Sequence, residues 1–230
     1  MAVLVGVRFI EEIEAGLRAP GRNLAEHPLI DKINRRELTR SQLAGMVMQV
    51  TLQTTEIVRW IGSLYADCPY SDVRRKIFMN LYEEELGAFS NSKAHFELCA
   101  DCARALGATD EQLASARPLP ATDRLILFGE VALRNQPWIV GFGAAMGFEY
   151  QSPLAFKRIA DGLREHYGLD DDGVRFWEVH VTADEDHGDA LVEALIRYAN
   201  TEELQAACRD AAWSYAECYH DMLSTYEAFV

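Results

Sequence analysis

Signals that start and stop helices recur along this chain of 230 residues, whereas the strict alternation of apolar and polar residues that marks strands is almost absent. Thr39 with Gln42, and Thr109 with Gln112, have the spacing of a capping box, in which two side chains satisfy free N–H groups at a helix start. Gly168 stands where a helix would end. These signals argue against a sheet-based fold and predict an all-α protein of eight to ten helices.

Composition limits what such a bundle can bind. Hydrophobic residues make up 49% of the sequence, so the chain can bury a core of its own, and we expect a single domain over residues 1–230. The formal net charge of −14 argues against nucleic acid and anionic membranes as partners, because phosphates are bound by basic surfaces. No segment resembles a signal peptide or a membrane span. Five cysteines without disulfide-like spacing fit a reducing compartment, so the expected location is the cytoplasm.

Three residues of one predicted helix suggest a metal site. Asp184 and His187 follow His180 by four and seven positions, and these offsets return side chains to the same face of a helix. Two imidazoles and a carboxylate therefore project into one small volume. Imidazole with carboxylate is the ligand set of non-heme iron, and it also suits zinc or manganese.

Further candidate ligands lie on other predicted helices, as a two-metal site in a helix bundle requires. Glu149 closes an otherwise apolar helix, and an acid in that position needs a partner. Glu56 lies on a mixed helix face, where an ion pair with a nearby arginine is the alternative. Of the acidic run before Gly87 we expect Glu85 to face inward, with Glu84 as the second choice, and His95 follows across a turn.

Taken in chain order, these residues resemble the ligand pattern of the heme-oxygenase-like diiron oxidases, which bind no heme. The pattern consists of Glu56, Glu85, His95, Glu149, His180, Asp184 and His187. The resemblance extends from about residue 28 to residue 195 and implies a heme-oxygenase-like helical bundle that holds two Fe(II) ions. It also implies O2 as co-substrate and the oxidation of a small molecule in a biosynthetic pathway. Known members oxidise amino acids, fatty acids or guanidines.

The residues expected around the site favour an amino acid, or a derivative of one, as the substrate. Periodicity predicts a lining that mixes polar groups with aromatic rings, and such a lining can hold an ammonium, a carboxylate and a compact side chain. The expected lining is Gln49, Gln53, Arg134 and Gln136 with Trp60, Trp138, Phe142 and Trp177. A fatty-acid oxidative decarboxylase of the same family is the alternative, and it would need a continuously apolar tunnel. An acidic surface gives no reason to expect an acidic carrier protein as partner. The sequence is compatible with a homodimer.

Metal-free relatives of the same bundle form the main rival class. Thiaminase-like enzymes use a cysteine nucleophile, and a cofactor-biosynthesis branch uses dioxygen without metal. A non-catalytic interaction protein is a third alternative. Cys99 and Cys102 also form a C-x-x-C motif, but a structural zinc site normally needs a second such motif, so we expect both to be small buried side chains.

Overall fold

The computed structural model describes the backbone of residues 2–229 and the side chains of residues 6–181 and 191–229. Across these residues the protein has eleven α-helices, two short 3-10 helices and no strand, which confirms the all-α prediction. The α-helices are α1 (Ala2–Leu17), α2 (Pro28–Asn34), α3 (Arg40–Asp67), α4 (Ser71–Leu86), α5 (His95–Ala105), α6 (Asp110–Ser115), α7 (Pro120–Arg134), α8 (Trp138–Glu149), α9 (Ser152–Tyr167), α10 (Asp171–Tyr198) and α11 (Glu202–Leu223). The 3-10 helices are Leu24–Glu26 and Ser224–Ala228.

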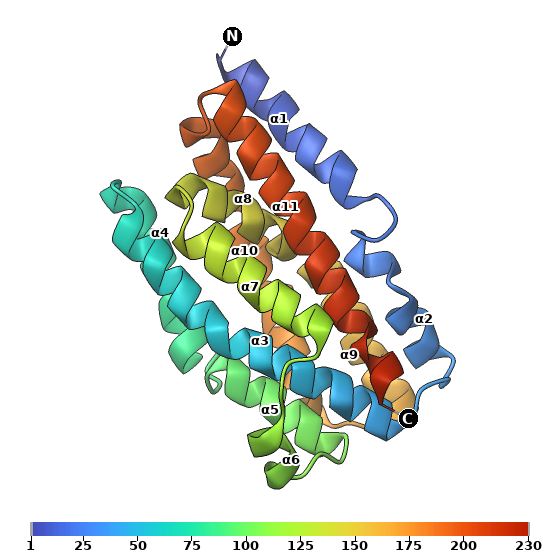
Figure 1. Cartoon of the computed structure of the whole chain (residues 1–230). Helices are drawn as coiled ribbons and strands as arrows, with labels where there is room; N and C mark the ends of the chain where they lie inside the picture. Colours follow the sequence, from blue (N-terminus) through green and yellow to red (C-terminus); the bar gives the residue numbers. More distant parts are fainter. Residues whose placement is uncertain (1, 230) are drawn as a thin grey trace.

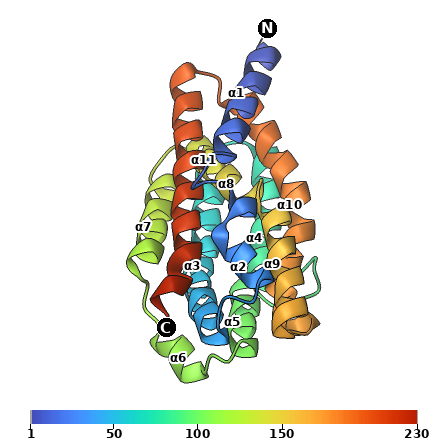
Figure 2. The ribbon, with the colours of Figure 1, turned by 90° about the vertical axis from the view of Figure 1, so that its right-hand side faces the viewer.

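The short helix α8 lies inside the bundle, surrounded by longer helices (Figures 1 and 2). It contacts α3, α7, α9, α10 and α11. Helix α1 packs along α10 and α11 at one end, and α4 lies on the outside, packed mainly against α3 (Figure 1). Within the described part of the chain, no helix combines the length and apolarity that crossing a bilayer would require.

Glycines bring α8 and α11 unusually close together. A Cβ atom added at Gly143 would lie 2.5 Å from the carbonyl oxygen of Cys208, and one at Gly147 would collide with the backbone of Ala212. Since real Cβ atoms do not approach backbone so closely, only glycine allows this contact. The close packing carries Phe148, whose ring lies 4.8 Å from that of Tyr219, to the centre of the bundle.

Local capping explains where several helices begin. Thr39 with Gln42 and Thr109 with Gln112 both form the predicted capping boxes. The sequence does not predict α2, which takes the number of α-helices beyond the expected eight to ten. Its N-cap is His27, whose Nδ1 accepts a hydrogen bond of 3.0 Å from the Leu29 N–H. Histidine is not among the residues preferred at this position, so the only conventional start signal of this helix is Pro28 at its first position.

Candidate metal centre

The end of α4 supplies the central carboxylate of the site. The inward residues Val73, Ile77, Asn80 and Glu84 follow one another at steps of four and three, so they share one face of the helix. The side chain of Glu84 is 11% exposed and lies against two histidines. Glu85 is exposed, so the expectation that it faces inward is wrong, because a step of one residue turns its side chain by about 100° away from that face.

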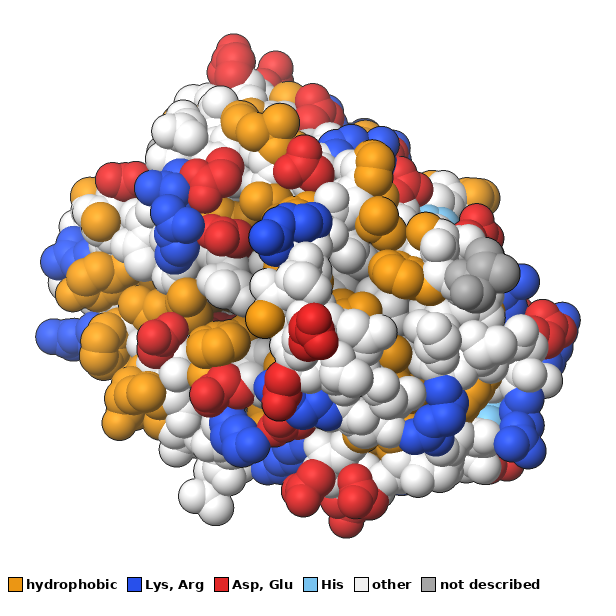
Figure 3. Space-filling model, turned by 60° about the horizontal axis from the view of Figure 1, so that its bottom comes forward, with side chains coloured by type: hydrophobic (Ala, Val, Ile, Leu, Met, Phe, Trp, Pro, Cys, Tyr) orange, Lys and Arg blue, Asp and Glu red, His pale blue; other side chains and the backbone are white. Residues whose placement is uncertain are grey.

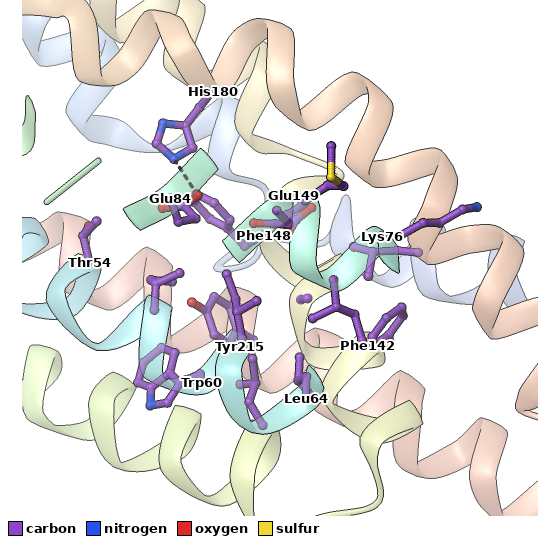
Figure 4. Close-up of a pocket in the computed structure, with 18 of the residues that line it drawn as sticks. Thr54, Trp60, Leu64, Lys76, Glu84, Phe142, Phe148, Glu149, His180 and Tyr215 are labelled. Carbon is purple, nitrogen blue, oxygen red and sulfur yellow. Dashed lines mark ion pairs between the residues drawn. The ribbon is translucent and has the colours of Figure 1, made fainter. Parts of the chain in front are cut away.

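Three ligand atoms from three helices converge at this point. Single ligand atoms of Glu84, His95 and His180 all lie within 4.8 Å of one another. Oε1 of Glu84 is 3.0 Å from Nδ1 of His95 and 3.9 Å from Nε2 of His180. Figure 4 shows His180 reaching from α10 towards Glu84. Helices α4, α5 and α10 therefore place one carboxylate and two imidazoles around a common space.

The backbone fixes the orientation of the His180 ring. Nδ1 of His180 lies 2.8 Å from the carbonyl oxygen of Phe176, which can only accept a hydrogen bond. Nδ1 therefore carries the proton, and Nε2 presents a lone pair towards Glu84. A histidine that donates one ring N–H to a backbone carbonyl and offers the other nitrogen is arranged as metal-bound histidines usually are.

Glu83 orients the second histidine and is a residue that the sequence analysis missed. It is 2% exposed, and its carboxylate accepts hydrogen bonds from the backbone N–H groups of Phe89 (2.6 Å) and Ser90 (3.3 Å). Oε1 of Glu83 lies 3.4 Å from Nε2 of His95. Burial raises the pKa of Glu83, but these hydrogen bonds outweigh that effect and lower it. Glu83 thus fixes both the turn after Gly87 and the ring of His95.

This arrangement leaves three acceptor atoms facing one another. When Glu83 accepts the Nε2 proton of His95, Nδ1 of His95 presents a lone pair to Glu84, as Nε2 of His180 does. Nδ1 of His95 is buried and has no hydrogen bond of good geometry among the described residues. Burial lowers the pKa of His95, but the carboxylates of Glu84 and Glu83 outweigh burial and raise it, so the two carboxylates favour a positive charge at this ring. The donor set of one carboxylate and two imidazoles fits iron, zinc or manganese.

The remaining predicted ligands occupy different positions. Glu149, at the end of α8, lines the same cavity as Glu84 and His180. Glu56 is not among the residues brought together: it forms an ion pair of 2.9 Å with exposed Arg59 and does not line the cavity. The side chains of Asp184 and His187 lie outside the described residues, although α10 continues through both positions.

A cavity of about 400 Å³ leads from this cluster towards the surface beside α4. Its walls are mostly apolar, and Figure 4 shows Trp60, Leu64, Phe142 and Phe148 along them. Lys76 lies at the far end from His180 (Figure 4). The side chains of α3, α4, α7, α8, α10 and α11 that form the walls are Gln53, Thr54, Ile57, Trp60, Ile61, Leu64, Lys76, Ile77, Met79, Asn80, Glu84, Leu133, Phe142, Ala145, Phe148, Glu149, Phe176, His180, Leu191, Glu193, Tyr215 and Tyr219.

Three of the eight predicted lining residues do line the cavity, namely Gln53, Trp60 and Phe142. The prediction is wrong for the others, which are Gln49, Arg134, Gln136, Trp138 and Trp177. Helical periodicity shows which residues share a face but not which neighbour that face meets.

Two of these misplaced residues have structural roles instead. Gln49 bonds the backbone of Arg117 and Leu119, and Arg134 pairs with Glu130 at 2.5 Å. Their polar groups are therefore used to hold α7 and the segment before it against α3.

Tyr215 is a second site residue that sequence reasoning missed. Figure 4 shows its side chain inside the cavity. Its hydroxyl accepts a hydrogen bond of 3.2 Å from Nε2 of Gln53. Burial, followed by the charge of Glu149, raises the pKa of Tyr215, so the phenol keeps its proton. Its position on an amphipathic helix gave no signal, because a buried tyrosine is more often a core residue.

None of the five cysteines is arranged as a nucleophile. All five are buried and free. Burial raises the pKa values of Cys102 and Cys208 to about 12 and that of Cys99 well above its usual range. Because the thiolate is the reactive form, these thiols are inert at neutral pH. The expectation of small buried cysteines at Cys99 and Cys102 is confirmed.

Fold and site together define a class of protein: a heme-oxygenase-like bundle with carboxylate and imidazole groups facing an internal cavity. A protein of unknown function from Shewanella denitrificans, described as having a heme oxygenase-like fold, superposes with a TM-score of 0.76 at 14% identity. The superposition covers 97% of this chain and 90% of that one. The pattern of the iron-containing redox enzymes matches residues 44–220, and the chain belongs to that family.

Two relatives that are named as synthases are similar in sequence. The chain is 31% identical to 4-aminobenzoate synthase of Nitrosomonas europaea, over 93% of this chain and 91% of the relative. It is 25% identical to 4-chloro-allylglycine synthase of Streptantibioticus cattleyicolor, over 62% of this chain and 54% of the relative. These similarities support membership of an enzyme family whose members act in small-molecule biosynthesis.

Proposed function

We propose that the protein is a non-heme diiron oxidase that uses O2 to oxidise a small molecule, an amino acid or a derivative of one, in a biosynthetic pathway. The observation that carries this proposal is the convergence of three buried acceptor atoms, on Glu84, His95 and His180, at one end of an internal cavity. One carboxylate and two imidazoles form a donor set that suits iron, zinc or manganese. Membership of the iron-containing redox enzyme family makes iron the natural choice.

In this proposal two Fe(II) ions are held by Glu84, His95, His180 and Glu149, together with Asp184 and His187 further along α10. Glu84 takes the role first expected of Glu85. Glu56 would join only by exchanging its ion pair with Arg59 for a metal ion.

The two ferrous ions would supply the electrons that reduce O2. The residues of the chain set the conditions for that chemistry. Glu83 keeps His95 in the orientation that turns its Nδ1 towards Glu84. The Phe176 carbonyl keeps His180 in the orientation that turns its Nε2 towards Glu84. The apolar walls exclude bulk water from the cavity. Tyr215, which retains its proton, offers a polar group inside these walls and is held in place by Gln53.

The charges at the far end of the cavity favour a zwitterionic substrate. Lys76 on α4 and Glu193 on α10 both line the cavity and form an ion pair of 2.5 Å. A carboxylate can pair with Lys76 while an ammonium pairs with Glu193. Lys76 precedes Glu84 by eight residues of one helix, which corresponds to about 12 Å along its axis. An amino acid bound at this end would extend its side chain through the apolar section towards the metal ligands.

The apolar walls would also accept the chain of a fatty acid, which remains the alternative substrate. Glu193 counts against it, because a second carboxylate beside that of a fatty acid is repelled. The names of the two relatives, 4-aminobenzoate synthase and 4-chloro-allylglycine synthase, denote products that carry both an amino group and a carboxylate. Both arguments favour an amino acid.

Anaerobic titration with Fe(II), followed by metal analysis, tests the metal centre. The proposal expects two iron ions per chain and O2 consumption that depends on iron and is stimulated by an amino acid. An enzyme active without metal would support the cofactor-biosynthesis alternative, and the inert cysteines already count against the thiaminase-like one. Stimulation by medium-chain fatty acids alone would support the decarboxylase. His180→Ala should bind less iron while its circular dichroism spectrum stays helical.

A further inference from the structure

A buried phenol stands part-way along the cavity. Tyr215 of α11 is 2% exposed and lines the cavity. In Figure 4 it lies between Glu84, which belongs to the candidate metal centre, and the apolar wall at Trp60. On the face of the molecule drawn in Figure 3, acidic and basic side chains are spread among apolar ones, whereas the walls of the cavity are mostly apolar. A hydroxyl group is therefore an unusual feature of this section of the wall.

The hydroxyl of Tyr215 has a hydrogen left to donate. Its oxygen accepts the hydrogen bond of 3.2 Å from Nε2 of Gln53, and an amide nitrogen can only donate. The hydrogen of the hydroxyl therefore points elsewhere, and none of the described residues accepts it. Gln53 is also 2% exposed, so this bond holds the phenol in a fixed position. A buried O–H group without an acceptor is costly, so the position favours a ligand that supplies one.

The surroundings of Tyr215 keep its hydroxyl protonated. Burial is the largest cause that raises the pKa of Tyr215, the charge of Glu149 is the second, and the charge of Glu84 acts in the same direction. The phenol is thus a neutral hydrogen-bond donor at physiological pH. Because the charges of Glu149 and Glu84 both act on it, Tyr215 lies within electrostatic reach of the candidate metal centre.

Other uncharged polar side chains of the cavity wall have partners of their own. Oγ1 of Thr54 donates a hydrogen bond of 2.9 Å to the carbonyl oxygen of Val50. Asn80 and Tyr219 line the cavity as well, and both interact with other groups. Among the described residues of the wall, Tyr215 therefore carries the hydroxyl that remains available to a ligand.

We propose that Tyr215 determines which side chain the amino-acid substrate carries, by donating a hydrogen bond to an uncharged acceptor atom within that side chain. The inference rests on the proposed function, which places the head group of the substrate at Lys76 and Glu193 and its side chain in the apolar section. The substrate then belongs to the amino acids whose side chain contains an ether, hydroxyl or carbonyl oxygen between the head group and the end that meets the metal ligands.

A pure hydrocarbon side chain is disfavoured beside Tyr215. It would displace water from the hydroxyl without replacing the hydrogen bond that the water makes. A site built to bond a polar group of its substrate rejects analogues that lack this group, because the polar group of the protein is left unpaired. This selection acts on the side chain, so it adds to the selection of the head group by Lys76 and Glu193 and can be measured separately.

Three amino acids of equal length test the proposal. Norleucine has an all-carbon side chain, whereas O-ethylserine and O-methylhomoserine each replace one of its methylene groups by an ether oxygen, at two successive positions. Calorimetric titration of the iron-loaded protein under nitrogen measures their binding. Wild type should bind at least one ether about tenfold more tightly than norleucine. In Tyr215→Phe that ether should lose about tenfold in affinity, while norleucine binds at least as well as to wild type, so the preference is abolished.

Tyr219→Phe is the matched control, because it removes a phenol hydroxyl from the same helix and the same cavity, and it should keep the ether preference. Tyr215→Phe should retain the iron content and the circular dichroism of wild type. Equal weakening of the ether and norleucine in Tyr215→Phe, or loss of the preference in Tyr219→Phe alone, would overturn the inference and leave the proposed function intact. If wild type binds none of the three amino acids, the head-group site fails, and the inference fails with it.

Discussion

Oε1 of Glu84 on α4 lies 3.0 Å from Nδ1 of His95 on α5, and both atoms are acceptors when Nε2 of His95 donates its proton to Glu83. Such a contact is stable when either a metal ion or a proton on Nδ1 lies between the two atoms. The same carboxylate oxygen faces Nε2 of His180, so one glutamate connects the two histidines.

Replacing each of two neighbouring glutamates by glutamine tests this relationship. Glu84→Gln should lose most of its bound iron, because an amide is a much weaker ligand than a carboxylate for Fe(II). Glu85→Gln, one position along the same helix but exposed, should keep the iron content of wild type. Metal analysis after anaerobic loading and gel filtration measures the difference. Equal iron content in the two variants would show that Glu84 is not a ligand.

Glu83→Gln should lower the stability of the fold as well as the affinity for iron. The substitution removes a charge that accepts hydrogen bonds from two backbone N–H groups, and it turns an N–H donor towards one of them. We expect a loss of about 1–3 kcal/mol in the free energy of unfolding, measured by urea denaturation of the metal-free protein. Iron affinity should fall by roughly 10- to 100-fold, as for other residues that orient a metal ligand. Unchanged iron affinity would mean that Glu83 serves only the turn.

The charged end of the cavity should select the head group of the substrate. For an amino acid that binds wild type, Glu193→Gln should weaken binding by roughly tenfold, because the ammonium loses a charged partner. The corresponding carboxylic acid without the amino group should bind the variant at least as well as it binds wild type. Calorimetric titration of the metal-free protein measures both. Asp161→Asn, which breaks an exposed ion pair of 2.7 Å with Lys157 on α9, should change neither affinity.

His27 should make the stability of the protein depend on pH. Burial, followed by the nearby His220, lowers the pKa of His27 to about 4. Its unfolded value is about 6.5, so between these two values the unfolded chain binds more protons than the folded one. The stabilisation is therefore complete above pH 6.5 and is lost as the pH falls towards 4, by on the order of 2–3 kcal/mol. His27→Asn, which keeps a residue suited to an N-cap, should flatten this part of the profile of unfolding free energy against pH.

Several parts of the site could be predicted from the sequence because they follow from local periodicity. His180 stands on the long amphipathic helix α10, and Glu149 closes the otherwise apolar helix α8. His95 follows a turn signalled by Gly87, which adopts a φ of 59° and ends α4. Each of these three residues lines the cavity or belongs to the cluster.

Other parts could not be predicted, and the choice among Glu83, Glu84 and Glu85 shows why. Consecutive residues of a helix point about 100° apart, so the run is compatible with any of the three facing inward. The rotation of α4 about its axis decides the matter, and that rotation is set by the packing of Val73 and Ile77 against the rest of the bundle. The rotation of α10 likewise could not be read from the sequence, and it places Trp177 against Cys102 and not in the cavity.

The sequence by itself determined that the chain is all-α and where most of its helices begin and end, because capping residues and apolar periodicity act over a few positions. It also carried the residues that resemble the ligands of an iron enzyme. Tertiary structure alone decided which glutamate meets His95, that Glu83 and Tyr215 belong to the site, and that an ion pair between Lys76 and Glu193 stands at the far end of the cavity. These features join helices that are distant in the chain, and their geometry depends on how side chains from all of them fill the same space.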